Sequence, residues 1–100
     1  MNIPENQILY VDLPDLSETF VDSLGTMIFD GQSARIELRV TRMDEIKPGV
    51  KPTAKRYPAC RLVLTPDAFL QLSTQLRNLV EMMIKQGTLK PIEPEKGTVH

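Results

Sequence analysis

Basic side chains and a tyrosine are concentrated in the middle of this 100-residue chain, where they are the best candidates for binding chemistry. Lys and Arg neutralise phosphate charges, and an aromatic ring stacks on a nucleobase. One hypothesis is therefore single-stranded nucleic-acid binding through the basic strand and loop of residues 35–61. The candidate contacts are Arg35, Lys51, Lys55, Arg56, Tyr57 and Arg61.

The charges are strongly segregated along the chain. Residues 1–30 hold six acidic residues and no Lys or Arg, whereas residues 31–61 hold eight basic residues and three acidic ones. Such asymmetry can mark a partner surface, or it can reflect acidic and basic strands that pair with each other. Because the net charge is −1 and aromatic residues are scarce, we favour solvated basic residues and cross-strand ion pairs over a nucleic-acid surface.

No combination of residue types indicates catalysis. His100 is the sole histidine and ends the sequence, so neither a Ser-His-Asp triad nor a cluster of metal-binding histidines can be assembled. Cys60 lies among leucines and is expected to be a buried apolar residue rather than a reactive thiol. We therefore expect no catalytic, cofactor-binding or metal-binding residues, and we predict that the protein is not an enzyme.

Composition favours a cytoplasmic location. The 41% hydrophobic and 25% charged content is ordinary for a globular protein. The first residues show no basic stretch followed by an apolar run, so we expect no secretory signal, and no apolar segment approaches the ~20 residues that span a bilayer. A lone cysteine cannot form an internal disulfide, as is usual in a reducing compartment. We expect no membrane partner.

The clearest structural signal is a strand that stops at Thr65-Pro66 and runs into a long amphipathic helix. Thr65 can cap the helix with its hydroxyl, and proline is well suited to the first helical position. Downstream, apolar residues recur at spacings of three and four, and Gly87 provides a stop. We predict a strand over residues 59–64 and a helix over residues 66–86 across one face of a sheet.

A hairpin is predicted upstream of that strand, centred on Asp30-Gly31. This dipeptide is typical of a two-residue type I′ turn, which requires positive φ at both central positions. Such a turn places Met27 opposite Ala34. Residues 44–58, which are rich in proline, are then expected to form a long loop.

The hairpin leaves a second apolar stripe on the face that the helix cannot cover. A second copy of the chain is the simplest partner, because small domains often complete their cores by association. Met82 lies beside the main apolar stripe of the helix and could also contact another subunit. The candidate dimer contacts are Phe20, Leu24, Ile28 and Met82.

The domain organisation follows from these segments. We predict a flexible N-terminal arm (residues 1–17), a single domain (residues 18–87) and a C-terminal tail (residues 88–100). The fold class is α+β: a small antiparallel sheet of three strands, or four if the arm adds one, packed by one long C-terminal helix.

Three segments resemble a family of short bacterial proteins catalogued only as a domain of unknown function. They are Thr19-Phe-Val-Asp-Ser-Leu, Cys60-Arg-Leu-Val-Leu-Thr-Pro and Leu72-Ser-Thr-Gln-Leu-Arg-Asn-Leu. The resemblance implies a small α+β module and transfers no catalytic residue. The order of strands and helix is also similar to the small dimeric single-strand DNA-binding folds of the transcriptional-coactivator and plant Whirly type, a likeness of fold alone.

Two functions follow as hypotheses. The leading one is a non-enzymatic, homo-oligomeric interaction module of the bacterial cytoplasm, most simply a homodimer that could also bind another protein. The alternative is the nucleic-acid binding described above.

Overall fold

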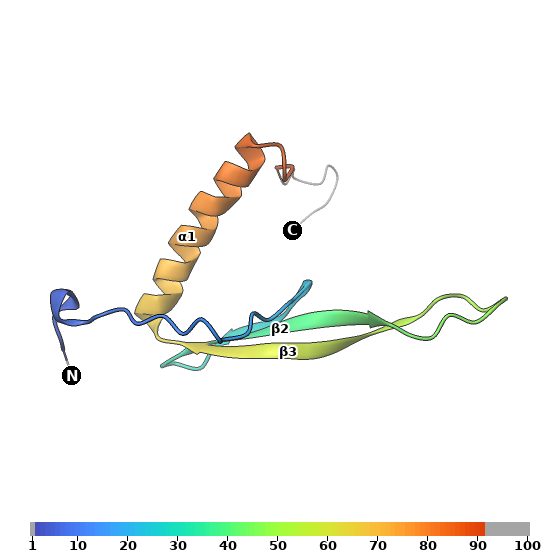
Figure 1. Cartoon of the computed structure of the whole chain (residues 1–100), viewed down its shortest axis with the longest axis horizontal. Coiled ribbons are helices and arrows are strands. Elements are labelled where there is room, and N and C mark those ends of the chain that lie inside the picture. Colours follow the sequence, from blue (N-terminus) through green and yellow to red (C-terminus); the bar gives the residue numbers. More distant parts are fainter. Residues whose placement is uncertain (1, 92–100) are drawn as a thin grey trace.

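The computed structural model describes residues 2–91, which form a three-stranded antiparallel sheet followed by one helix (Figure 1). The strands lie in the order β1-β2-β3, and they span Ser23–Phe29, Ala34–Met43 and Ala54–Leu64. The helix α1 spans Pro66–Lys85, and a short 3-10 helix, η1, spans Glu5–Gln7 in the arm. The predicted α+β fold is confirmed, and the described part of the arm adds no fourth strand.

Both ends of α1 follow the sequence signals. Pro66 is the first helical residue, and the hydroxyl of Thr65 accepts a hydrogen bond of 3.1 Å from the Ala68 N–H. Gln86 is the C-cap, and Gly87 follows it at φ 78°, a conformation that glycine adopts without steric cost. The predicted cap and the predicted stop are therefore confirmed.

The loop between β1 and β2 is longer than the predicted two-residue turn. It runs from Asp30 to Ser33, and the Asp30 carboxylate accepts two backbone N–H groups of the loop at 2.9 and 2.7 Å. Gly31 has φ 98°, but Asp30 lacks the positive φ that a type I′ turn requires. Met27 consequently lies opposite Ile36, and the register predicted from the sequence is wrong.

A β-bulge interrupts β1 between Leu24 and Met27. Leu24 lies opposite Leu38, and Met27 lies opposite Ile36, so the two intervening residues of β1 share one partner position on β2. Because Leu38 and Ile36 are two residues apart, they lie on one face of the sheet. Leu24 and Met27 therefore lie on that same face despite their odd spacing.

β3 begins at Ala54, earlier than predicted, so the loop that precedes it is shorter than residues 44–58. Pro58 lies within this strand, next to a bulge whose extra residue is Ala59 of β3, opposite Leu38 and Arg39 of β2. In the described sheet β3 is an edge strand, and edge strands and bulges are where proline is tolerated. β2 and β3 consequently form a long hairpin with its tip far from α1 (Figure 1).

The two faces of the sheet differ in chemistry. We call one face the inner face, because α1 begins above it. It carries Ile36 and Leu38 of β2 and their cross-strand partners Met27, Leu24, Leu62 and Cys60. The opposite face is the outer face. Among residues 2–91 the buried apolar side chains are Ala34 and Ile36, each 5% exposed. The core is therefore very small and lies where the first turns of α1 meet the sheet.

After its first turns, α1 rises away from the sheet (Figure 1). Phe69 and Leu72 are half-buried, whereas Leu76 is 50% exposed and Leu79 is 47% exposed. A single extended residue, Thr65, connects β3 to α1, so the chain has no linker that could turn the helix back onto the sheet. α1 therefore covers only the near part of the inner face.

Candidate functional site

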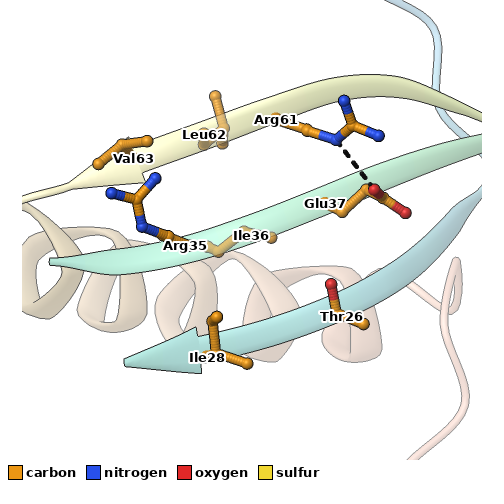
Figure 2. A pocket seen from close by; sticks show the side chains of 8 residues that line it. All are labelled: Thr26, Ile28, Arg35, Ile36, Glu37, Arg61, Leu62 and Val63. Carbon is orange, nitrogen blue, oxygen red and sulfur yellow. Dashed lines mark hydrogen bonds and ion pairs between the residues drawn. The ribbon is translucent and has the colours of Figure 1, made fainter. Parts of the chain in front are cut away.

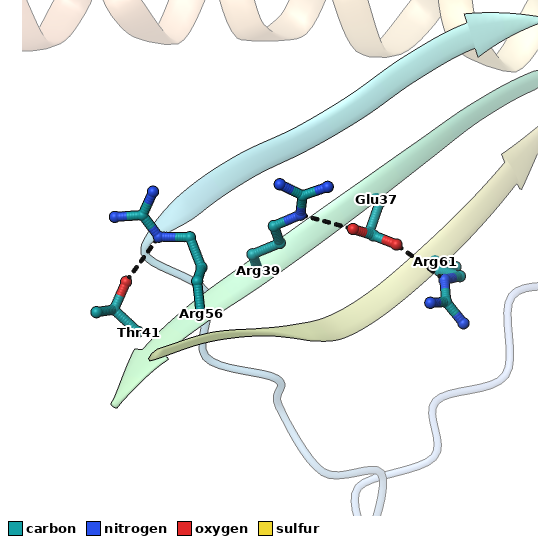
Figure 3. Close-up of polar contacts among 5 residues, drawn as sticks. All are labelled: Glu37, Arg39, Thr41, Arg56 and Arg61. Carbon is teal, nitrogen blue, oxygen red and sulfur yellow. Dashed lines mark hydrogen bonds and ion pairs between the residues drawn. The ribbon is translucent and has the colours of Figure 1, made fainter. Parts of the chain in front are cut away.

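Glu37 on β2 binds two arginines on the outer face (Figure 3). Its Oε1 accepts a hydrogen bond of 2.6 Å from Arg39 Nε, and its Oε2 accepts one of 3.0 Å from Arg61 Nε. The sheet makes this possible because Arg61 lies opposite Glu37 in the β2–β3 register. Hydrogen bonds from Arg39 first, and then from Arg61, lower the pKa of Glu37. Two of the basic charges on this face are thus shared with one carboxylate.

Two further basic residues of the predicted nucleic-acid site also form ion pairs. Arg35 Nε lies 2.8 Å from Asp30 Oδ2, and Lys55 Nζ lies 2.6 Å from Asp44 Oδ1. The hydrogen bond with Asp44 raises the pKa of Lys55, and the same bond lowers the pKa of Asp44. Each of these exposed pairs joins a strand residue to a residue outside the strands, whereas the Glu37–Arg61 pair is of the cross-strand kind that the charge pattern favoured.

The six predicted nucleic-acid contacts do not share one surface. Arg56 donates a hydrogen bond of 3.1 Å to Thr41 Oγ1 on the same side of the sheet as Arg61 (Figure 3). Tyr57 follows Arg56 in β3 and therefore points to the inner face. Lys51 lies beyond the strands, at the tip of the hairpin. The sheet thus separates the Tyr57 ring from Arg56 and Arg61. A base stacked on Tyr57 would lie on the opposite face from the arginines that would bind its phosphates.

A shallow depression of about 200 Å³ lies on the outer face between Arg35 and Arg61 (Figure 2). Their side chains are 52% and 72% exposed, and each guanidinium already has a carboxylate partner. Because Glu37 is shared with Arg39, three arginines face two carboxylates here, and the depression offers a ligand no more than one net positive charge. It is lined by Thr26, Ile28, Arg35, Ile36, Glu37, Arg61, Leu62 and Val63.

A different kind of surface opens between α1 and the inner face. A cleft of about 280 Å³ lies there, and it is mostly apolar. We call the open space between α1 and the inner face, which begins at this cleft, the wedge. The cleft is lined by Met27 and Ile36 of the sheet and by Phe69, Leu72, Ser73 and Leu76 of α1.

The four predicted dimer contacts are exposed but do not form one stripe. Leu24 is 58% exposed and Ile28 is 57% exposed. The β1 bulge leaves Leu24 on the inner face, whereas Ile28 pairs with Arg35 and lies on the outer face (Figure 2). Phe20 is 74% exposed in the segment just before β1, and Met82 is 46% exposed on α1. The predicted continuous stripe on the outer face is therefore wrong, although each residue is free to meet a partner.

Sequence reasoning did not single out the wedge, because helical periodicity does not reveal that α1 leaves the sheet, and the bulge that places Leu24 on the inner face was missed. The available signal was Gly25, since a glycine within a strand often marks a bulge or a close approach of other atoms. A Cβ on this residue would lie 2.9 Å from the carbonyl oxygen of Glu37 and would also meet the Arg39 guanidinium. Glycine is therefore the residue that fits this position.

The described residues form neither a metal-binding cluster nor a membrane-spanning helix. Within residues 2–91, no three His, Cys, Asp or Glu side chains gather closely enough to hold a metal ion. His100 lies outside the described residues. Cys60 is half-buried on β3, opposite Leu38 on the inner face. In the same described range, no helix combines the length and apolar character needed to cross a membrane.

No protein-family model, curated protein or solved structure matches this chain. The resemblance to short bacterial proteins of unknown function stays a prediction. Any functional proposal must therefore start from the surfaces that the fold itself leaves open.

Proposed function

We propose that this chain is a non-enzymatic, homodimeric interaction module of the bacterial cytoplasm. The observation that carries the proposal is the excess of exposed surface. The accessible surface is 9771 Å², whereas a compact monomer of 11.3 kDa exposes about 5,700 Å² by the usual scaling of area with mass. The excess is about 4,000 Å², which is a large part of the surface that folding normally removes from water.

The dimensions of the chain support the same proposal. Its radius of gyration is 19.0 Å, compared with about 13 Å for a compact domain of 100 residues. Part of the extra surface belongs to the arm and to the tip of the β2–β3 hairpin, which project from the sheet (Figure 1). The remainder includes the exposed apolar side chains of the inner face and of the far half of α1.

A second copy of the same chain is the partner that this surface fits. Permanent dimers bury about 2,000–5,000 Å² in total, which an excess of this size can supply from two chains. Closed twofold symmetry also covers the same patch on both subunits, so no apolar face is left to drive further association. The outer faces and the loops at residues 44–53 would stay exposed and available to another protein.

The oligomeric state tests this proposal. Light scattering on the purified full chain at micromolar concentration should give twice the mass of 11.3 kDa. Because folding and association would be linked, the melting temperature should also rise with protein concentration. A monomeric mass, together with a melting temperature that is independent of concentration, would overturn the proposal.

A further inference from the structure

Two apolar surfaces of the chain face each other across the wedge. One is the far half of α1, where Leu76, Leu79 and Val80 are 50%, 47% and 40% exposed. The other is the far part of the inner face, where Leu24 is 58% exposed and Leu38 is half-buried. An occupant of the wedge would have to be apolar on two sides, one toward a sheet and one toward a helix.

α1 itself has that property. At 100° per residue, its apolar side chains from Ala68 round to Leu70 cover about 200° of the circumference, whereas a helix on a single surface needs only about 100°. The near half of α1 uses part of this sector on its own sheet. The rest of the sector is unused within one chain, which is the condition expected of a helix that packs between two layers.

The lengths of the elements are also compatible. A helix of 20 residues is about 30 Å long. A strand of 11 residues is about 36 Å long, and the inner face of β3 carries Leu64, Leu62, Cys60 and Tyr57 before the charged Lys55 at its far end. A second helix can therefore lie along the part of the inner face between Leu64 and Tyr57.

We propose that α1 of a second copy fills the wedge, so that each helix packs against the inner face and the helix of its partner. This inference rests on the proposed dimer and adds its geometry: two sheets on the outside and two helices between them. Twofold symmetry makes the arrangement self-consistent, because filling one wedge places the first helix in the second wedge. The outer faces, with the ion pairs of Asp30 and Glu37, remain in solvent, and the Lys55–Asp44 pair lies at the far end of the inner face.

A matched pair of substitutions on β1 tests which face is covered. Leu24 and Ile28 are almost equally exposed, at 58% and 57%, but lie on opposite faces. Leu24→Glu places a carboxylate in the wedge and should raise the dimer dissociation constant by roughly 30-fold or more, as for a central interface residue. Ile28→Glu should change it by less than about threefold, as for a residue outside the contact. Equal effects of the two substitutions, or a larger effect of Ile28→Glu, would overturn the proposal.

Disulfide trapping gives a second measurement that does not depend on destabilising the fold. The native Cys60 lies on the inner face, so a cysteine on the far half of α1 should meet Cys60 of the partner subunit. Leu76→Cys, Leu79→Cys and Val80→Cys would be made singly and oxidised with copper phenanthroline. At least one should yield a covalent dimer on a non-reducing gel that disappears when Cys60→Ala is added.

Matched controls come from the polar side of α1. Asn78→Cys and Glu81→Cys lie outside the apolar sector and should not trap a dimer through Cys60. A protein that is dimeric by light scattering, yet traps no dimer through Cys60 from any of the three apolar positions, would overturn the wedge arrangement and leave the dimer standing. A monomeric protein would overturn both.

Discussion

The side chain of Arg39 lies over Gly25, across the β1–β2 pair, and reaches Glu37 on its own strand. This contact places the bulge in β1 beside the outer-face ion pairs of Glu37 with Arg39 and Arg61. It is possible because residue 25 has no Cβ: an added one would meet the guanidinium and would lie 2.9 Å from the Glu37 carbonyl oxygen. Arg39 thus lies against the bulge on the outer face, and the same bulge directs Leu24 into the wedge on the inner face.

Gly25→Ala should therefore destabilise the protein. The guanidinium can move aside but the carbonyl cannot, so we expect a loss of about 1–3 kcal/mol, the usual cost of overpacking. Urea unfolding followed by circular dichroism measures it. Thr26→Ala, in the same bulge, adds no atoms and serves as the control, with an expected change within about 0.5 kcal/mol. If Gly25→Ala were as stable as the wild type, the bulge would not depend on the close approach of other atoms to residue 25.

Acid should weaken the β1–β2 hairpin through Asp30. The hydrogen bond from Arg35, followed by those from the Gln32 and Ser33 N–H groups, lowers the pKa of Asp30 from 3.8 to about 2. Since the folded-state pKa is the lower one, the stabilisation is complete above about pH 4 and is lost as the pH falls toward about 2. Unfolding midpoints in urea, measured between these pH values, should fall less steeply for Asp30→Asn than for the wild type.

The control for this pH prediction is Asp15→Asn, which removes one carboxylate from the arm. It should keep the wild-type pH dependence between about pH 4 and about pH 2, because the arm is not part of the hairpin. If the urea unfolding midpoints of Asp30→Asn and of the wild type fall equally steeply with pH, Asp30 contributes nothing to acid sensitivity.

The nucleic-acid hypothesis predicts behaviour that the geometry does not favour. Because Lys55 and Arg56 already have partners within the chain, we expect Lys55→Ala with Arg56→Ala to leave the anisotropy of a labelled single-stranded oligonucleotide unchanged at moderate salt. The titration should show no micromolar binding of the oligonucleotide by the wild type or by the double variant. Micromolar binding by the wild type that weakens steeply with salt, and weakens further in the variant, would restore the alternative function.

The sequence by itself determined the elements whose causes are local. Both ends of α1 were predictable, because each is set by a property of one residue: the hydroxyl of Thr65, the ring of Pro66 and the backbone freedom of Gly87. The α+β class also followed from the strand and helix patterns. The segregation of charge predicted pairing between the acidic and basic segments only in part: among the described residues, Arg35–Asp30 joins the two segments, whereas the pairs of Glu37 and Asp44 lie within residues 31–61.

The tertiary structure decided what depends on atoms distant in sequence. The bulge at Gly25 arises from a strand partner and the side chain of Arg39, and it moves Leu24 to the inner face, away from Ile28. A hydrophobic pattern assigns alternate residues to two faces, but it cannot reveal where one extra residue reverses that assignment. Nor does helical periodicity state which surface a helix packs against. α1 departs from its own sheet, and this departure creates the wedge. Both features depend on the strand register and on the direction in which the chain leaves β3, so only the tertiary structure revealed them.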